Sequence, residues 1–412
     1  MKILGIETSC DETAVCIIEA EGKQIKILGN QLYSQIALHT QYGGVFPMMA
    51  KREHQANLTP LFEKVLEESN LLVYSSPYTV DSNKDSSQST IDNLLSTILN
   101  REPELLEQLA NLLKKIERPN IDAIAVTNGP GLEPALWVGV NFAKALSTIW
   151  NIPVIPTNHM EGHIVAAGLQ QVDSDKYIVD SKNQNYQTIY SLRSTIYPSL
   201  ALLVSGGHTQ LVLIKDFQNY EVIGNTKDDA IGEAFDKVAR ILGLPYPGGP
   251  QISRLAEKER LEFPNKKTSY PLPRPMIHSG DLNFSFSGIK TAVLYMVKKI
   301  ANLTDAIKQE IACEFENAVV EVIVKKTRQA IEENNIQTLI IGGGVSANKK
   351  IRQDFTKLAE ELGVTIMIPE LSASTDNALM IAVAGYLQIS STSRHSRTDG
   401  SPDFRAEGNL SL

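Results

Sequence analysis

The sequence predicts an α/β protein built from two related lobes, and three observations support that prediction. Apolar runs with strand-like alternation are followed by runs with helical spacing near the N-terminus, and again between Ser199 and Ile389. Both stretches follow the order strand–strand–strand–helix–strand–helix, with extra helices in the second and no sequence identity between them. The chain has 412 residues, 42% of them hydrophobic, which corresponds to roughly two to three folding units with sizeable cores. Two such lobes predict a cleft between them that suits a nucleotide.

The elements of the first lobe follow from local patterns. Alternation predicts strands at 2–7, 13–18, 25–28, 121–126 and 153–156, and spacings of three and four predict helices at 46–69, 104–116, 134–150 and 159–169. The stretch Ser75–Asp92 is dense in Ser, Asp and Asn, so we expect a loop or insertion there.

The second lobe follows from the same patterns. Strands are expected at 199–205, 210–215, 221–225, 337–341 and 364–368, and helices at 229–242, twice within 287–334, and at 346–362 and 375–389. We expect a turn at 243–250, a basic proline-spaced linker at 263–278 and a polar insertion at 172–195. The predicted domains are therefore an N-terminal lobe, 1–158, completed by the helix near 375–389, a C-terminal lobe, 159–374, and a disordered tail, 390–412.

Composition limits the class of protein. The net charge is −8, from 39 Lys and Arg against 47 Asp and Glu, which makes the chain a poor nucleic-acid binder by itself. Its three cysteines have no framework spacing, and this favours a reducing compartment. We expect no membrane span and no signal peptide, because no apolar run is long enough and the first residues enter a strand at once. The expected location is the cytoplasm.

One helix carries two histidines that can act together. His159 and His163 stand four residues apart and share a helix face, so they can bind one metal ion or be ordinary helical histidines. Glu161 lies about 200° round the helix from His159, whereas a metalloprotease needs its glutamate beside the first histidine. The spacing therefore disfavours a protease. Asp376, before the last helix, is a helix cap or the third ligand of a His-His-Asp site.

Two glycine-rich turns follow predicted strands. Ser205-Gly206-Gly207 separates two strands, and Gly342-Gly343-Gly344 opens a helix with Ser346 as a possible cap. Such turns let backbone N–H groups approach a phosphate or carboxylate, although each can equally be a tight strand exit. Neither matches a P-loop or a Rossmann fingerprint, which disfavours both classes.

A series of motifs, taken together, resembles one family. The motifs are Ile6–Ala14, Gly129–Leu132, Asn158–His163, Val204–Thr209, Gly232–Lys237, Tyr246–Pro250, Phe284–Gly288, Gly343–Asn348 and Thr375–Asn377. They occur in the order of the TsaD family, the tRNA adenosine threonylcarbamoyltransferases, and look closest to its bacterial branch. The resemblance implies an actin/Hsp70/sugar-kinase-like fold, with two lobes around a nucleotide-binding cleft.

The resemblance also implies site residues. The family's metal ligands correspond to His159, His163 and Asp376, which would bind one divalent ion per subunit, with Fe²⁺ expected before Zn²⁺. Its substrate contacts correspond to Leu203, Val204, Ser205, Gly206, Gly207, Asp236, Gly249 and Asn348. No general base stands out, and Asp11 and Glu12 are weak candidates for a catalytic role.

The implied reaction transfers a threonylcarbamoyl group from threonylcarbamoyl-AMP to N6 of adenosine 37 in tRNAs that read codons beginning with adenine. ATP or ADP is expected to fit the same cleft, and the implied partners are tRNA, a TsaB-like paralogue and a TsaE-like ATPase. The alternatives are a small-molecule carbamoyl or phosphoryl transferase and an ATP-binding module of the same fold.

Two features require an explanation within this reading. Ser374 stands where bacterial relatives often have cysteine, and this change removes none of the three implied ligands. The negative charge predicts that partner proteins or local basic patches make the phosphate contacts. The candidate patches are Lys266, Lys267 and Arg274, and Lys349, Lys350 and Arg352.

Overall fold

The computed structural model describes residues 1–75, 84–172, 188–264, 266–392 and 404–412. The chain forms two compact units. Unit 1 comprises 1–35, 45–193 and 376–411, and unit 2 comprises 36–44, 194–375 and Leu412. The expected boundary at residue 158 is therefore misplaced, because the helix that begins at His159 belongs to unit 1 together with the last helix.

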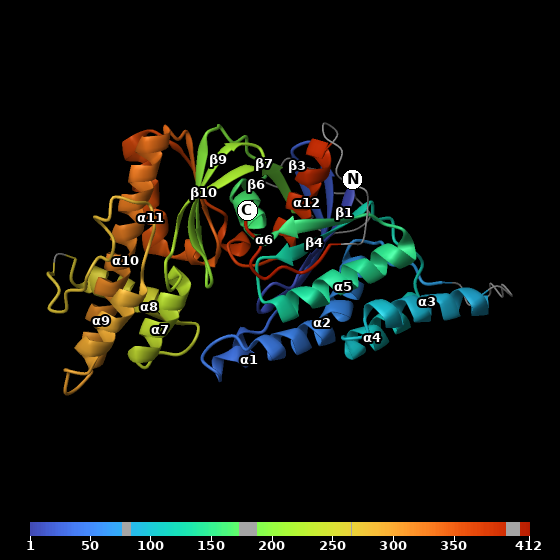
Figure 1. The fold of residues 1–412 in the computed structure, drawn as a ribbon, viewed down its shortest axis with the longest axis horizontal. Coiled ribbons are helices and arrows are strands. Elements are labelled where there is room, and N and C mark those ends of the chain that lie inside the picture. Colours follow the sequence, from blue (N-terminus) through green and yellow to red (C-terminus); the bar gives the residue numbers. More distant parts are fainter. Residues whose placement is uncertain (76–83, 173–187, 265, 393–403) are drawn as a thin grey trace. The chain divides into compact units, whose positions relative to one another are not determined.

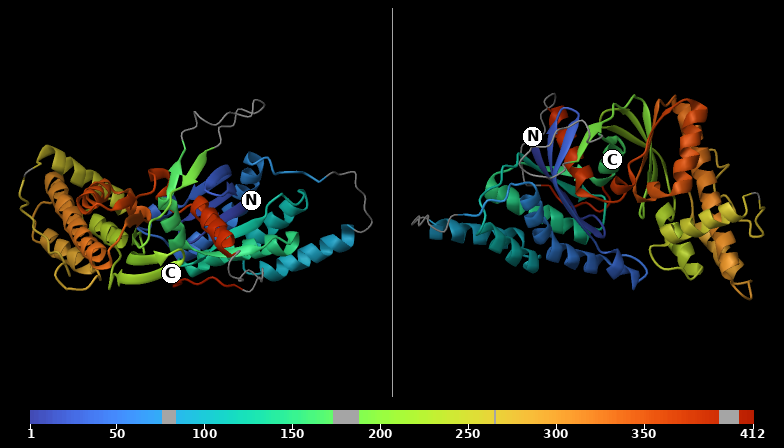
Figure 2. Two further views of the ribbon diagram at one scale, coloured as in Figure 1. Left: turned by 90° about the horizontal axis from the view of Figure 1, so that it is seen from above. Right: turned by 180° about the vertical axis from the view of Figure 1, so that it is seen from behind.

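Unit 1 is organised around a seven-stranded sheet in the order β5-β4-β1-β2-β3-β7-β6 (Figure 1). Its strands are β1 (Lys2–Glu7), β2 (Glu12–Glu21), β3 (Gln24–Ser34), β4 (Ala123–Gly129), β5 (Val154–Asn158), β6 (Leu169–Gln171) and β7 (Ile189–Leu192). The first three form an antiparallel meander, and β4 and β5 run parallel to β1. The antiparallel pair β6 and β7 extends the sheet beyond β3 (Figure 2).

Helices cover both faces of this sheet. Leu4 and Ile6 of β1 pack on one face against α2 (Pro47–Glu68) and α5 (Glu133–Trp150), with α4 (Pro103–Leu113) behind them. Ile3, pointing the other way, belongs to the core formed with α12 (Ala378–Thr392), and α6 (His159–Ala167) packs against α12. Gly5 allows α12 to approach β1, since a Cβ there would lie 2.3 Å from the Ala378 carbonyl oxygen.

Unit 2 repeats the plan with a five-stranded sheet in the order β10-β9-β8-β11-β12. Its strands are β8 (Ser199–Val204), β9 (Thr209–Asp216), β10 (Asn219–Asn225), β11 (Thr338–Gly342) and β12 (Thr365–Met367). Its helices are α1 (Ile36–Thr40), α7 (Ile231–Ile241), α8 (Gly248–Glu262), α9 (Ser287–Val297), α10 (Asp305–Asn334) and α11 (Lys349–Leu362). The order and directions match those of β3-β2-β1-β4-β5 in unit 1, which confirms the predicted α/β class with two related sheets.

Two sequence expectations need correction within the described residues. Helix α3 (Lys84–Ile98) occupies part of the stretch expected to be a loop, because Leu95 is buried in the unit 1 core. Helix α8 begins at Gly248, inside the expected turn at 243–250. Residues 76–83 and 173–187 of the two expected insertions lie outside the described part of the chain. None of the helices in the described part has the length and apolar character needed to cross a membrane.

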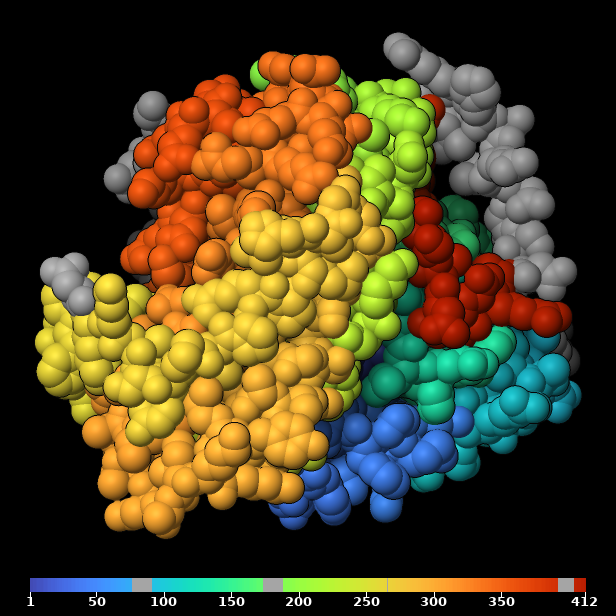
Figure 3. Space-filling view, turned by 60° about the vertical axis from the view of Figure 1, so that its left-hand side comes forward, coloured from blue at the N-terminus to red at the C-terminus, as the bar shows by residue number. Residues whose placement is uncertain are grey.

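The expected disordered tail is wrong for residues 404–412. Phe404 and Ala406 pack against Leu136 and Val140 of α5, and these last residues are visible at the surface in Figure 3. The Glu407 N–H donates to the Asn128 carbonyl oxygen at 2.7 Å. Apolar side chains within a polar composition explain why composition alone misled the prediction. Residues 393–403 lie outside the described part.

Candidate metal centre and ligand cavity

The two histidines occupy the first turns of α6. The helix begins directly after β5 because the Asn158 side chain caps it, accepting a hydrogen bond from the Met160 N–H at 2.8 Å. His159 and His163 are both buried, and their ring centroids lie 4.7 Å apart with the ring planes at 82°. The local sequence therefore places two imidazoles on one buried face of unit 1.

Asp376 completes this group from a distant part of the sequence. Its Oδ1 lies 3.4 Å from Nε2 of His159 and 3.1 Å from Nε2 of His163. The alternative role as cap of α12 falls to Asn377, whose side-chain oxygen accepts from the Met380 N–H at 2.9 Å. The carboxylate of Asp376 is thus directed to the histidines, and one ligand atom from each of the three residues lies within 4.8 Å of the others.

This group fits a divalent cation chemically. Nε2 of His163 is buried and has no hydrogen-bond partner of acceptable geometry, so a ligand there would remove an energetic cost. Two imidazole nitrogens and one carboxylate oxygen form a donor set that suits Fe²⁺ or Zn²⁺ and leaves positions open. The three residues could therefore hold such an ion.

A carboxylate behind the group fixes one of the histidines. Oε2 of Glu7, at the end of β1, lies 3.0 Å from Nδ1 of His159 and accepts a hydrogen bond from the Thr127 hydroxyl at 2.6 Å. Ser9 Oγ lies 3.3 Å from the same nitrogen. Because Nδ1 is engaged, Nε2 is left to face Asp376. Glu7 was not selected from the sequence, where its signal was an acidic residue ending a buried apolar strand.

The weak catalytic candidates lie in the turn between β1 and β2. Asp11 and Glu12 are both buried, and the Ser34 hydroxyl donates to Glu12 Oε1 at 3.4 Å. Burial, followed by the negative charges of Asp11 and Asp376, raises the pKa of Glu12 to about 10. With this pKa, the Glu12 carboxyl is protonated at neutral pH. A cation beside Asp376 would oppose this shift, since positive charge favours the carboxylate.

Asp376 itself behaves differently. Burial opposes its ionisation, but the charge of His159 and the proximity of both imidazoles hold the pKa of its carboxyl well below the usual range. Glu161 is not in the three-residue group, and it accepts a hydrogen bond from the Gln388 side chain at 2.9 Å. This agrees with the helix-face argument against a protease.

Unit 2 contains a separate cavity of about 690 Å³. Of the substrate contacts implied by resemblance, Gly206, Asp236, Gly249 and Asn348 line it. The remaining four, namely Leu203, Val204, Ser205 and Gly207, do not. The side chains of Leu203 and Val204 are fully buried within β8, and Ser205 and Gly207 flank Gly206 in the β8–β9 turn. A run of consecutive residues cannot all face one cavity, because successive side chains in a strand point to opposite faces.

Asn348 is the residue that organises one wall. Its side-chain oxygen caps α11 by accepting from the Ile351 N–H at 3.0 Å, so the cap expected at Ser346 is wrong. Its amide nitrogen donates to Ser253 Oγ at 2.7 Å and to Glu316 Oε1 at 2.6 Å. Gly343 has φ of +88°, and a Cβ there would lie 2.4 Å from the Val204 carbonyl oxygen, so the turn before this wall requires glycine.

Sequence reasoning missed several lining residues. Glu316 is fully buried on α10, and it accepts hydrogen bonds from both Asn348 and Arg260. Asp236 accepts from the Gly248 N–H at 2.6 Å and thereby fixes the start of α8. Arg260 lies in the last turn of α8 and Glu316 lies within α10, and neither belongs to a recognisable motif, so no local signal marks them.

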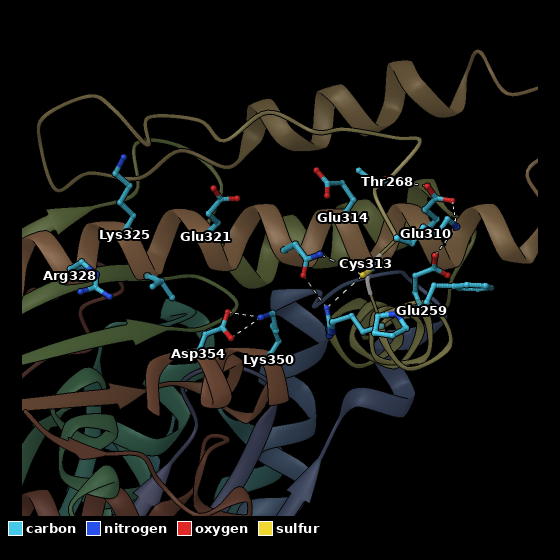
Figure 4. A pocket seen from close by; sticks show the side chains of 16 residues that line it. Glu259, Thr268, Glu310, Cys313, Glu314, Glu321, Lys325, Arg328, Lys350 and Asp354 are labelled. Atoms are coloured by element: carbon cyan, nitrogen blue, oxygen red, sulfur yellow. Dashed lines mark hydrogen bonds and ion pairs between the residues drawn. The ribbon is translucent and has the colours of Figure 1, made fainter. Parts of the chain in front are cut away.

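The expected basic patches are largely neutralised. At a second cavity of unit 2, of about 650 Å³, Lys350 pairs with Asp354 (Figure 4). Lys266 also lines this cavity and pairs with Glu259 and Glu310. The other patch residues with carboxylate partners are Arg274, with Glu314 and Glu321, and Lys349, with Glu257. Arg352 donates to Pro369 and Ser374. Cations already paired with carboxylates are poor phosphate ligands, so these patches do not form a free basic face.

Comparisons with known proteins agree on one family. The model of the family described as TsaD, tRNA N6-adenosine threonylcarbamoyltransferase, matches residues 26–74, 102–186 and 186–383. A tRNA N6-adenosine threonylcarbamoyltransferase of Thermosipho africanus is 40% identical over 386 residues, covering 94% of this chain and 94% of that protein. One of Chromobacterium violaceum is 39% identical over 393 residues, covering 94% and 93%. Among solved structures, component A of (R)-2-hydroxyglutaryl-CoA dehydratase of Acidaminococcus fermentans aligns with a TM-score of 0.46 at 13% identity, covering 95% of this chain and 99% of that chain.

Proposed function

The chain belongs to the family of tRNA N6-adenosine threonylcarbamoyltransferases, and from this premise we propose that it forms threonylcarbamoyladenosine in tRNA. The proposed donor is threonylcarbamoyl-AMP, and the acceptor is N6 of adenosine 37 in tRNAs that read codons beginning with adenine. The observation that carries the proposal is the near-full-length match at 40% identity to an enzyme of that name. A small-molecule transferase or an ATP-binding module has no comparable support.

We propose that His159, His163 and Asp376 hold one divalent ion, with Fe²⁺ as the first candidate and Zn²⁺ as the second. The support is the convergence of three ligand atoms and the unpartnered Nε2 of His163. When bound, such an ion supplies Lewis-acid polarisation of a carbonyl or phosphoryl oxygen. Glu7 orients His159 for that role.

The unit 2 cavity is the proposed site for the adenylate part of the donor, and ATP or ADP would occupy the same space. Its volume of about 690 Å³ lies in the range of small-molecule sites. Gly206 and Gly249 carry no side chain and so expose backbone to a ligand, while Asp236 and Asn348 offer polar groups. Anchoring the adenylate would supply much of the rate by fixing the carbonyl carbon near the amine.

In the proposed transfer, a bond forms between N6 and the carbonyl carbon, and the bond from that carbon to the AMP oxygen breaks. The leaving group departs as AMP, and one proton leaves N6. Backbone N–H groups of the Ser205–Gly207 turn are proposed to stabilise the charge that develops on oxygen. Asp11 stays the candidate to take the proton, and Glu12 could take it only if a bound cation lowered its raised pKa.

The family acts on tRNA, and we propose that this chain reaches its tRNA with the help of partner proteins, a TsaB-like paralogue and a TsaE-like ATPase, in the cytoplasm. The support is physical: the net charge is −8, and four of the six expected patch cations are paired with carboxylates. A chain with this charge distribution lacks the counterion release that drives tRNA binding.

The function is tested by complementation. The gene is expressed in a bacterial strain depleted of its own enzyme, and threonylcarbamoyladenosine in bulk tRNA is measured by mass spectrometry. Restoration by the wild-type chain, but not by a His159→Ala variant expressed at the same level, is the expected result. If soluble wild-type protein restores nothing even with its cognate partners supplied, the proposed function is wrong.

A further inference from the structure

Arg352 connects helix α11 to the segment 369–374 of unit 2. Its Nη2 donates to the Pro369 carbonyl oxygen at 2.7 Å and to Ser374 Oγ at 2.9 Å. The Ser374 hydroxyl in turn donates to the Glu370 carbonyl oxygen at 2.9 Å. Ser374 is fully buried, so this small network is shielded from water and is correspondingly strong.

One end of this connection begins at the cavity. Arg352 lies one turn into α11, the helix capped by Asn348. Asn348 lines the cavity, whereas Arg352 does not. A ligand that orders Asn348 therefore orders the first turn of α11, because a capped helix end moves as a unit with its cap.

The other end leads to the three-residue group. The Pro369–Ser374 segment held by Arg352 is followed at once by Thr375 and Asp376, where the chain passes from unit 2 into unit 1. Beyond Asp376, Asn377 caps α12. Asp376 is thus the link between two anchored points, with Arg352 and Ser374 on one side and the helix cap on the other.

We propose that Arg352 is a positioning residue that links occupancy of the unit 2 cavity to the placement of the Asp376 carboxylate. An adenosine moiety in the cavity restrains Asn348 and α11, Arg352 passes the restraint to residues 369–374, and Asp376 loses less freedom when it binds a cation. Ligand and cation then bind with positive cooperativity, each tightening the other. The inference rests on the proposed function, because adenylate and cation are the ligands it connects.

This role also accounts for Ser374. Its hydroxyl accepts from Arg352 and donates to Glu370 at the same time, which a thiol does only weakly. The difference from bacterial relatives at this position therefore affects the strength of the link and leaves the ligand set intact.

The test measures the Kd of Zn²⁺ for the full chain with and without saturating adenosine. Adenosine is the probe because it has no phosphate that could itself bind the ion. In the wild-type chain, adenosine is expected to tighten Zn²⁺ binding about fivefold or more. In Arg352→Gln, this ratio should fall below about twofold, while adenosine affinity stays within about twofold of wild type, because Arg352 does not line the cavity.

Two further variants keep the test decisive. Lys357→Gln removes a cation from the same helix without touching the network and should retain the wild-type ratio. Ser374→Ala removes one acceptor of Arg352 and should give a Kd ratio between those of wild type and Arg352→Gln. If Arg352→Gln does not fold, the ratio in Ser374→Ala alone tests the proposal. Hydrogen exchange at residues 369–377 gives an independent readout, which adenosine should slow in wild type and not in Arg352→Gln.

An undiminished ratio in both Arg352→Gln and Ser374→Ala, or no effect of adenosine in wild type, overturns the proposal. Threonylcarbamoyl transfer is assayed in parallel on the same preparations. Transfer without cooperativity would reject this inference and leave the proposed function standing, whereas cooperativity without transfer, in an assay supplied with tRNA and the cognate partners, would reject the function.

Discussion

Oε2 of Glu7 lies 3.0 Å from Nδ1 of His159, with no exposure of the carboxylate to solvent. The contact fixes the ring so that its other nitrogen faces Asp376. A buried carboxylate in this place acts through His159, because within the described part of the chain its other hydrogen bonds are with the Ser9 N–H and the Thr127 hydroxyl. Its removal should therefore weaken a metal site without deleting a ligand.

Replacing Glu7 with Gln should lower metal affinity about 10- to 100-fold, the usual effect of losing such an outer partner. Competition with a chelating dye measures the change. Glu21→Gln, an exposed change in the adjacent strand, is the control. Equal affinities in Glu7→Gln and wild type would show that the contact does not orient His159.

His159→Ala and His163→Ala should each abolish stoichiometric metal loading and transfer, since a two-ligand remainder holds divalent ions poorly. Glu161→Gln should keep the metal, because Glu161 is outside the ligand group and contacts Gln388. Metal content per chain by mass spectrometry gives the answer. A metal-free Glu161→Gln variant would contradict the assignment of ligands.

Glu316→Gln should weaken adenosine binding by about tenfold, equivalent to about 1.4 kcal/mol. The amide offers one acceptor oxygen where the carboxylate serves both Asn348 and Arg260, so one partner is left unsatisfied in a buried place. Calorimetric titration measures the loss. Glu332→Gln, exposed on the same helix, serves as the matched variant and should bind normally.

Asp228 makes the free energy of unfolding of unit 2 depend on pH. Burial opposes ionisation, but hydrogen bonds from Ser285, Ser287 and the Phe286 N–H outweigh it and lower its pKa. A lowered pKa adds stability above the unfolded value of about 3.9, and this stability is lost as the pH falls through the folded value. Asp228→Asn should cost about 1 kcal/mol at pH 7, a figure reduced for the exposed position of the carboxylate, and less at pH 3. Urea unfolding at both pH values measures it, and an equal cost at the two would contradict the prediction.

Removing residues 404–412 should lower the melting temperature of unit 1 by several degrees, because Leu136 and Val140 lose the apolar contacts of Phe404 and Ala406. Phe404→Ala should reproduce part of the loss. Arg405→Ala, an exposed neighbour, should have little effect. An unchanged transition in the truncated chain would mean that the packing contributes nothing to stability.

Much of the fold was accessible from the sequence because its signals are local. The short apolar runs at 3–6 and 200–204 identify buried strands, and the repeated element order predicts two similar sheets. The division into units was not accessible. It depends on contacts between distant segments, which assign the helix of His159 to unit 1 and residues 36–44 to unit 2.

The residues of the candidate site likewise differ in whether a local sequence pattern marks them. His159 and His163 carry a signal in their own spacing, whereas the local sequence left Asp376 open as a helix cap or a third ligand and only the resemblance favoured the ligand. Glu7, Glu316 and Arg352 act through partners that lie tens to hundreds of residues away, and single residues in strands or helices have no periodic signature. The tail was misjudged because its few apolar side chains are diluted by a polar composition.

The discontinuity of unit 1 has a consequence for biosynthesis. Residues 194–375 of unit 2 form an uninterrupted stretch that a ribosome completes before unit 1 has its last helix. Helix α12, which covers one face of β1, and the carboxylate of Asp376 become available only once residues 376–392 have been synthesised. During synthesis, the continuous part of unit 2 can therefore fold before unit 1 is complete, and the proposed ion could be bound by all three residues only after nearly the whole chain has been translated.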